Sequence, residues 1–97
     1  MDGVEHITRA DGNIFADIGF SAVEAENLLV RSQLMLDLHE TIRGRRLTQA
    51  KAAKLLGVAQ PRISDLVRGK IGLFSVDSLI AMLSRAGRRV EVRVKAG

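Results

Sequence analysis

The sequence predicts an all-α domain of four to five helices that ends in one short β-strand. Three observations support this fold class. Apolar residues recur at helical spacing through most of the chain. Serine and threonine residues suited to helix starts alternate with glycines suited to helix ends. Near the end of the chain, residues 89–95 alternate valine with charged residues, which is the period of a half-buried strand.

Length and composition limit the protein to a small globular class. The chain has 97 residues, enough for one domain, and 46% of them are hydrophobic. It contains no cysteine, which excludes disulfides and thiolate metal sites and favours a cytoplasmic location. The sequence has neither an apolar run of about 20 residues nor a signal peptide, so we expect no membrane partner.

The charges are unevenly distributed along the chain. Residues 1–28 hold six acidic residues and one basic residue, whereas residues 43–70 hold eight basic residues and one acidic residue. A basic block of this kind indicates either a polyanionic partner such as nucleic acid or a solvated face.

Residues 1–20 form an N-terminal leader whose structure the sequence leaves open. The Asp-Gly pair at Asp11 and Gly12 is compatible with the turn of a small hairpin, because short apolar groups flank it. An ordered coil that packs Phe15 and Phe20 on the domain is the alternative.

Residues 21–87 carry the helical domain. Ser21 with Glu24 fits a capping box at the start of a segment, 21–43, that forms one long helix or two in series. The predicted caps of two later helices are Thr48 and Ser75. The glycines predicted to end the helices are Gly44, Gly57, Gly69 and Gly87.

The single proline, Pro61, marks the start of a short helix over residues 60–68. Proline is favoured at the first position of a helix, because the N–H it lacks has no helical partner there and its fixed φ suits the helix. The preceding helix is equally short, with Ala53 at a close approach and Gly57 at a sharp turn. Together with Ile63, at offsets 0, +4 and +10, these residues form a helix-turn-helix pattern, whose second helix enters the DNA major groove.

The stretch "LTQAKAAKLLGVAQPRISDLVRGK" resembles the helix-turn-helix of the XRE class, the class of the phage repressors. That resemblance implies a lambda repressor-like fold and covers roughly residues 43–86. The segments "NIFADIGF", "FSVDSLIAML" and "GRRVEVRV" extend it, because together with the core they resemble HigA-like antitoxins of type II toxin–antitoxin systems.

Four residues at the front of the second helix are candidate base contacts. Gln60 can pair with adenine, Asp65 can accept a hydrogen bond from cytosine, and Pro61 can touch a thymine methyl group. Arg62 can reach guanine, although the resemblance associates its position more often with phosphate. The candidate base contacts are Gln60, Pro61, Arg62 and Asp65.

Phosphate contacts are expected around the same helix. Gln49 lies at a helix N-terminus, which attracts anions, and the resemblance assigns backbone contacts to Arg68 and Lys70. The candidate phosphate contacts are Gln49, Arg68, Lys70, Arg46 and Lys51, with Arg45 as a further possibility.

Structural explanations compete with these assignments. Asp65 could pair with Arg62 or Arg68 within the helix. Arg45 and Arg46 could interact with a helix dipole. The two histidines, His6 and His39, stand alone in the sequence, so we expect no metal site and no cofactor.

Residues 88–97 are predicted to be a dimerisation strand. One strand in a helical domain cannot satisfy its own backbone, so it needs a partner. Either the leader or the same strand of a second subunit could supply one, and related antitoxins are dimeric. The second subunit places Val90, Val92 and Val94 over the helical core on one face.

The sequence therefore predicts a homodimeric, sequence-specific repressor that binds a pseudo-palindromic operator in double-stranded DNA. The resemblance further implies an antitoxin that autoregulates its operon and neutralises a RelE/HigB-like toxin. A stand-alone or phage-type XRE regulator without a toxin is one alternative, and an interaction module that does not read DNA is another. No catalytic constellation is present in the sequence, so we expect no enzyme.

Overall fold

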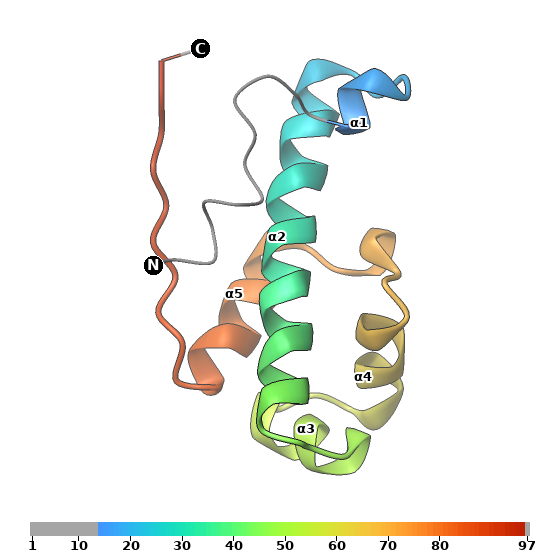
Figure 1. Ribbon diagram of the computed structural model, residues 1–97, viewed down its shortest axis with the longest axis vertical. Coiled ribbons are helices and arrows are strands. Elements are labelled where there is room, and N and C mark those ends of the chain that lie inside the picture. Colours follow the sequence, from blue (N-terminus) through green and yellow to red (C-terminus); the bar gives the residue numbers. More distant parts are fainter. Residues whose placement is uncertain (1–13, 97) are drawn as a thin grey trace.

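The structure, a computed structural model, describes residues 14–96. Within this range the chain forms α-helices joined by short loops, and one long helix extends along the whole molecule (Figure 1). The elements are α1 (Ile14–Asp17), α2 (Ala22–Gly44), α3 (Gln49–Leu56), α4 (Gln60–Val67), the 3-10 turn η1 (Ile71–Leu73) and α5 (Val76–Arg85).

Helix α2 is one continuous helix of 23 residues, which decides between the two alternatives for residues 21–43. Its start is the predicted capping box. The Glu24 N–H donates to Ser21 Oγ at 3.2 Å, and the Ser21 N–H donates to Glu24 Oε1 at 3.3 Å. These two bonds satisfy backbone donors that have no partner inside the helix.

The predicted caps of the shorter helices are confirmed, whereas the end of the long helix α2 differs from the prediction. Thr48 and Ser75 cap α3 and α5 through their side chains. Helix α2 does end at Gly44, but the left-handed residue that reverses the chain is Arg46, at a φ of 52°. The turn is closed by the Leu47 N–H, which donates to the Ile42 carbonyl at 3.0 Å.

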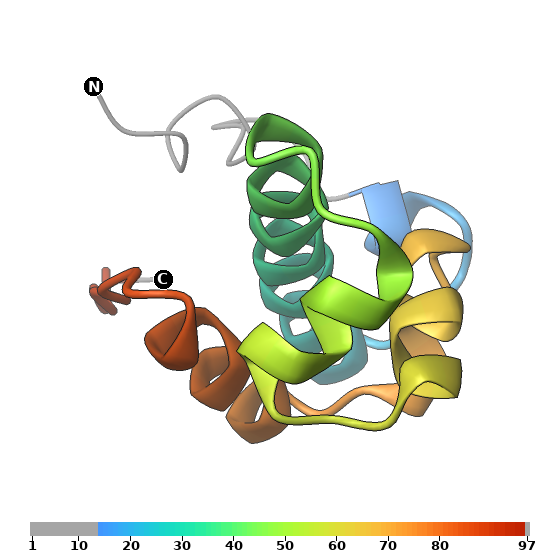
Figure 2. The same ribbon diagram turned by 90° about the horizontal axis from the view of Figure 1, so that it is seen from below.

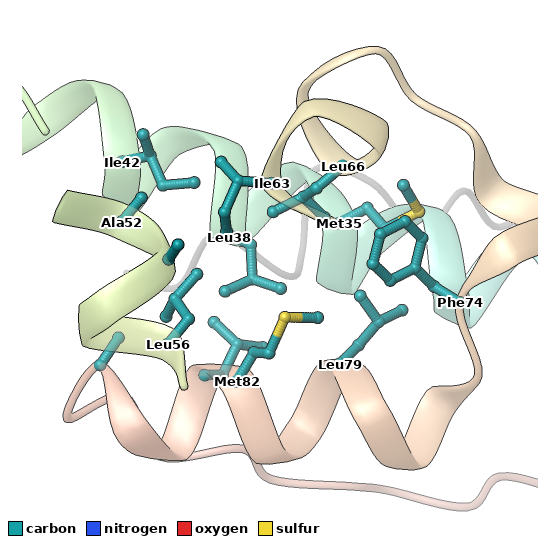
Figure 3. Close-up of a cluster of buried hydrophobic side chains, with 13 residues drawn as sticks. Met35, Leu38, Ile42, Ala52, Leu56, Ile63, Leu66, Phe74, Leu79 and Met82 are labelled. Atoms are coloured by element: carbon teal, nitrogen blue, oxygen red, sulfur yellow. The ribbon is translucent and has the colours of Figure 1, made fainter. Parts of the chain in front are cut away.

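The core lies where α2, α3, α4 and α5 meet (Figures 2 and 3). It is aliphatic apart from Phe74, which follows η1 and is almost fully buried. Met35 of α2 and Met82 of α5 are both in this cluster. The burial of these apolar side chains is the main stabilising contribution to the fold.

Part of the N-terminal leader is helical. Residues Ile14–Asp17 form the single turn α1, which packs on α2, and the rings of Phe15 and Phe20 meet edge to face at 6.2 Å. The hairpin hypothesis is wrong for its second arm, because these residues are helical. The turn at Asp11 and Gly12 lies outside the described residues.

The tail, residues 88–96, has no regular secondary structure in the described chain. It leaves the end of α5 and runs as a narrow extended segment beside the helical body (Figure 1). Val90 packs partly against the core, whereas Val92 and Val94 are 74% and 93% exposed. A strand is defined by hydrogen bonds to a neighbouring strand, so the predicted strand stays a prediction that depends on a partner.

Candidate nucleic-acid interface

Helices α3 and α4 form a helix-turn-helix around Gly57. Gly57 has a φ of 71°, which glycine adopts without the steric cost that a Cβ would bring. The next N–H, of Val58, donates to the Ala53 carbonyl at 3.1 Å and closes the turn. A Cβ at residue 57 would also meet the guanidinium of Arg85 from α5. The turn is therefore fixed by backbone conformation and by a close neighbour.

Pro61 is the second residue of α4, one position later than the optimal site for proline. Ala59 is the N-cap and contributes no side-chain hydrogen bond. The missing N–H of Pro61 still falls in the first turn, where backbone donors have no helical acceptor. The following N–H, of Arg62, donates to the Ala59 carbonyl at 2.9 Å. The helix thus starts where the sequence predicts it, and the ring stiffens its first turn.

The N-terminal end of α4 faces solvent. Gln60 and Pro61 are exposed, whereas Ile63 and Leu66 are buried in the core. This division fixes the rotation of the helix about its own axis. An exposed amide on a rigid helix end has the geometry required to meet base edges in a major groove.

Arg62 is held within the chain. Its Nη1 donates to the Leu73 carbonyl at 2.8 Å, and its guanidinium carbon lies 4.1 Å from the centre of the Phe74 ring. These contacts connect α4 to η1 and to the residue that follows it. To reach a base, the Arg62 side chain would have to leave both partners, so its base contact stays a prediction with a structural competitor.

Asp65 pairs with Lys70, at 3.6 Å between the carboxylate and the ammonium. The expected intramolecular partners were Arg62 and Arg68, and neither is the partner seen here. Gly69, the residue before Lys70, has a φ of 72°. This conformation turns the chain so that Lys70 lies back toward α4. A pair as exposed as this contributes little to stability, so it competes only weakly with the predicted DNA contacts of the two side chains.

The remaining predicted phosphate contacts are exposed. Gln49 is the first residue of α3, beside the Thr48 cap, and Arg68 is the C-cap of α4. Arg45, by contrast, donates to the Ala86 carbonyl at 2.7 Å and joins the α2–α3 loop to the end of α5. The exposed candidates are Gln49, Arg46, Lys51 and Arg68.

Arg31 is a structural residue that the sequence pattern does not reveal. Arg31 of α2 donates to the Ile71 carbonyl at 3.2 Å and to the Phe74 carbonyl at 3.3 Å, and its Nε donates to Asn27 at 2.6 Å. Together with Arg62 it lines an open groove of about 620 Å³ beside η1 and the start of α5. These bonds span 40 and 43 residues of sequence, so no local signal could have revealed them.

The sequence model of a family described as a helix-turn-helix domain matches residues 14–95. The chain belongs to this helix-turn-helix family. A solved structure, provisionally described as an XRE family transcriptional regulator, is similar to this helix-turn-helix protein with a TM-score of 0.71 and 34% sequence identity. The similarity covers 76% of this chain and 83% of that chain. A comparison with curated proteins finds no match.

The family and the structural similarity agree on the general class of protein. Both matches indicate the class of DNA-binding transcriptional regulators, whose members typically are not enzymes. Within residues 14–96, no helix combines the length and apolar character that a bilayer crossing requires. In the same range, no three histidine, cysteine or acidic side chains are grouped so that they could hold a metal ion.

Proposed function

We propose that this helix-turn-helix protein is a sequence-specific transcriptional repressor that inserts the N-terminal end of α4 into the major groove. The exposed start of α4 carries this proposal. Ile63 and Leu66 of α4 are buried in the core, so Gln60 and Pro61 at its N-terminal end are presented to solvent on a packed support. A rigid element is what base recognition requires, because hydrogen bonds to base edges are strongly directional.

Each candidate residue has a proposed role at the operator. Gln60 reads adenine through its amide, and Pro61 contacts a thymine methyl group. Asp65 accepts from cytosine when Lys70 moves to a phosphate. Arg62 reads guanine only if it exchanges the Leu73 carbonyl for DNA. The proposed phosphate contacts are Gln49, Arg46, Lys51, Arg68 and Lys70.

The proposed functional unit is a homodimer joined through the tail. Val92 and Val94 are exposed in the single chain, and a second copy of the tail would cover them. The family match extends to residue 95 and so includes these valines. Two α4 helices could then occupy successive major grooves roughly 34 Å apart on a pseudo-palindromic operator.

We further propose that the protein is a HigA-like antitoxin of a RelE/HigB-like toxin. The support is the sequence resemblance together with the surface of α1 and the start of α2, at the end of α2 remote from α3 (Figure 1). Ile14, Ile18 and Val23 are exposed there. The same segment carries Asp17, Glu24 and Glu26, which would complement a basic toxin.

The DNA-reading proposal is tested with Gln60→Ala and the DNA upstream of the protein's own gene. The substitution should weaken binding to the footprinted operator by ~1–3 kcal/mol while leaving binding to random duplex nearly unchanged. Gel-shift titrations of both duplexes measure this difference. Lys54→Ala, an exposed change on α3, is the control. Equal losses on operator and random DNA would show that Gln60 does not read a base.

The antitoxin proposal is tested by co-purification with the products of the neighbouring genes. A small basic partner should bind the wild-type protein and be lost with Val23→Lys. The matched control is Leu36→Lys, another exposed apolar position of α2. If no neighbouring product binds but the operator is still footprinted, the protein is a stand-alone XRE regulator.

A further inference from the structure

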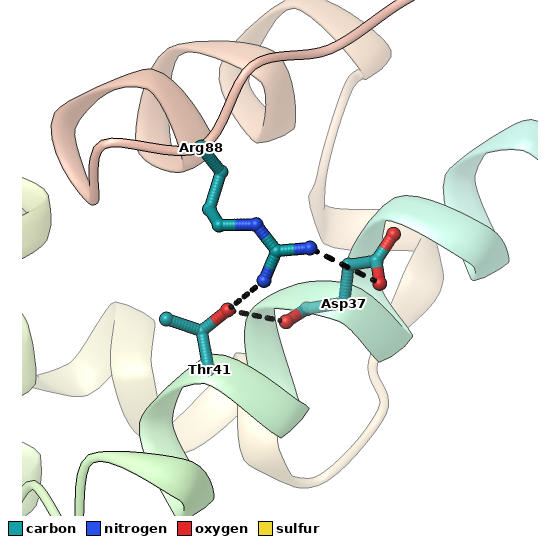
Figure 4. Close-up of polar contacts among 3 residues, drawn as sticks. All are labelled: Asp37, Thr41 and Arg88. Atoms are coloured by element: carbon teal, nitrogen blue, oxygen red, sulfur yellow. Dashed lines mark hydrogen bonds and ion pairs between the residues drawn. The ribbon is translucent and has the colours of Figure 1, made fainter. Parts of the chain in front are cut away.

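The tail leaves the helical body in a fixed direction because Arg88 is held at its start. The Arg88 backbone N–H donates to the Leu83 carbonyl at 2.9 Å. Its Nη1 donates to Thr41 Oγ1 at 3.0 Å, and its Nη2 lies 3.9 Å from Asp37 Oδ1 (Figure 4). The buried Thr41 hydroxyl donates in turn to the Asp37 carbonyl at 2.8 Å. Three contacts thus fix the first residue of the tail on α2 and α5.

This anchor determines which face of the tail is turned toward the helices. Arg88 contacts α2 and Val90 packs on the core, so these two residues face the body. In an extended chain, alternation places Val92 and Val94 on the same face. Glu91 and Arg93 share the other face, where their side chains form an exposed ion pair at 3.8 Å.

The tail has the properties of an unpaired edge strand. Within residues 14–96, the backbone–backbone hydrogen bonds end at Arg88. The following N–H and C=O groups, together with two exposed valines, offer a template for a second strand. The next step rests on the homodimer proposed above. We propose that two tails pair antiparallel, with Val92 opposite the partner's Val92.

The charge pattern selects this register. A two-fold axis through Val92 places Glu91 opposite the partner's Arg93, and the symmetry creates this opposite-charge pair twice. Cross-strand pairs of opposite charge stabilise a sheet, and like charges destabilise it. The same register places Val90 opposite the partner's Val94, so that every valine of the tail meets a valine. Only the outermost pair, Arg89 with the partner's Lys95, is unfavourable.

The neighbouring registers are worse by the same rules. An axis through residue 91 brings two Glu91 side chains together, and an axis through residue 93 brings two Arg93 side chains together. An axis through Val90 retains an opposite-charge pair between Arg89 and Glu91. It places Arg88 opposite Val92, however, although Arg88 is already bound to Thr41 and Asp37. That register also leaves Val94 without a valine partner.

Single cysteines test the register directly, because the chain contains no cysteine. In the proposed register, the two copies of residue 92 have Cα atoms about 4.5–5.5 Å apart, within the range of a disulfide. The two copies of residue 90 are offset by about 13 Å. Val92→Cys should therefore form the most disulfide-linked dimer on a non-reducing gel after mild oxidation. The comparison variants are Val90→Cys, Glu91→Cys, Arg93→Cys and Val94→Cys, and a maximum at any of them overturns the register.

Charge reversal provides an independent test in the cysteine-free protein. Glu91→Arg and Arg93→Glu should each raise the dissociation constant of the dimer about tenfold, measured by analytical ultracentrifugation, because each creates two like-charge pairs. The double variant restores both pairs with the charges exchanged and should return the constant to near the wild-type value. A double variant as weak as the single variants contradicts the register. A wild-type protein that stays monomeric contradicts the dimer itself, whereas the DNA-reading proposal depends on neither outcome.

Discussion

At the scale of single residues, the helix-turn-helix depends most on Gly57. Its positive φ lets the chain reverse between α3 and α4 within a few residues. The side chain of Arg85 covers the turn so closely that no Cβ fits beside it in the present position. The guanidinium end of Arg85 can move away, so the lasting cost of a side chain here is conformational.

Gly57→Ala should lower the free energy of unfolding by about 1–2 kcal/mol, because alanine must enter the left-handed region. Urea denaturation followed by circular dichroism measures this loss. Gly44→Ala is the matched control. Gly44 is helical, has open space around it and lacks a positive φ, so alanine should raise stability by about 0.4–1 kcal/mol. Equal effects at the two positions would contradict this account of the turn.

Residues that act on their immediate neighbours were predictable from the sequence. Ser21, Thr48 and Ser75 cap helices through bonds that span three residues. Gly57 and Gly69 turn the chain at their own positions, because each adopts a positive φ. The left-handed Arg46 could not be predicted in this way, because arginine has no intrinsic preference for a positive φ and the surrounding loop imposes it.

At the scale of elements, α4 is held in place by more than its buried face. Arg62 connects it to η1 through the Leu73 carbonyl and the Phe74 ring, while Arg31 holds the same loop from α2. These contacts join segments 11 to 43 residues apart, so side-chain pattern alone could not reveal them. The sequence located α4 but could not distinguish an arginine that supports this helix from one that would read DNA.

Arg62→Ala should therefore reduce the free energy of unfolding by about 1–2 kcal/mol, through loss of the cation–π contact and the hydrogen bond. Arg62→Lys should recover only part of this loss, since an ammonium cannot reproduce the planar stacking of the guanidinium. Thermal denaturation of both variants measures the effect, and Arg68→Ala, at an exposed position next to the same helix, should change stability by less than about 0.5 kcal/mol. Unchanged stability in Arg62→Ala would instead favour the base-reading role.

At the scale of the whole molecule, the proposed interfaces lie on different parts of one small body. Helix α4 presents its exposed end beside α3, α1 lies at the remote end of α2, and the tail extends beyond α5 (Figures 1 and 2). A dimer formed through the tail would leave α4 of each copy uncovered. Operator binding would then combine two weak half-site contacts into one strong interaction.

Removal of residues 91–97 tests this coupling while it keeps the Arg88 contacts and the packing of Val90. The truncated protein should be monomeric, and its affinity for the full operator should fall roughly a hundredfold or more. Its affinity for a half-site duplex should not change, because α3 and α4 are intact. The dependence of log affinity on log salt concentration should fall to about half, since half as many phosphates are neutralised.

Removal of residues 96–97 alone leaves the paired segment complete and should have none of these effects. If the truncated protein still binds the full operator as tightly as the wild type, two copies of α4 occupy both half-sites without the tail. The dimer would then have to form through another surface.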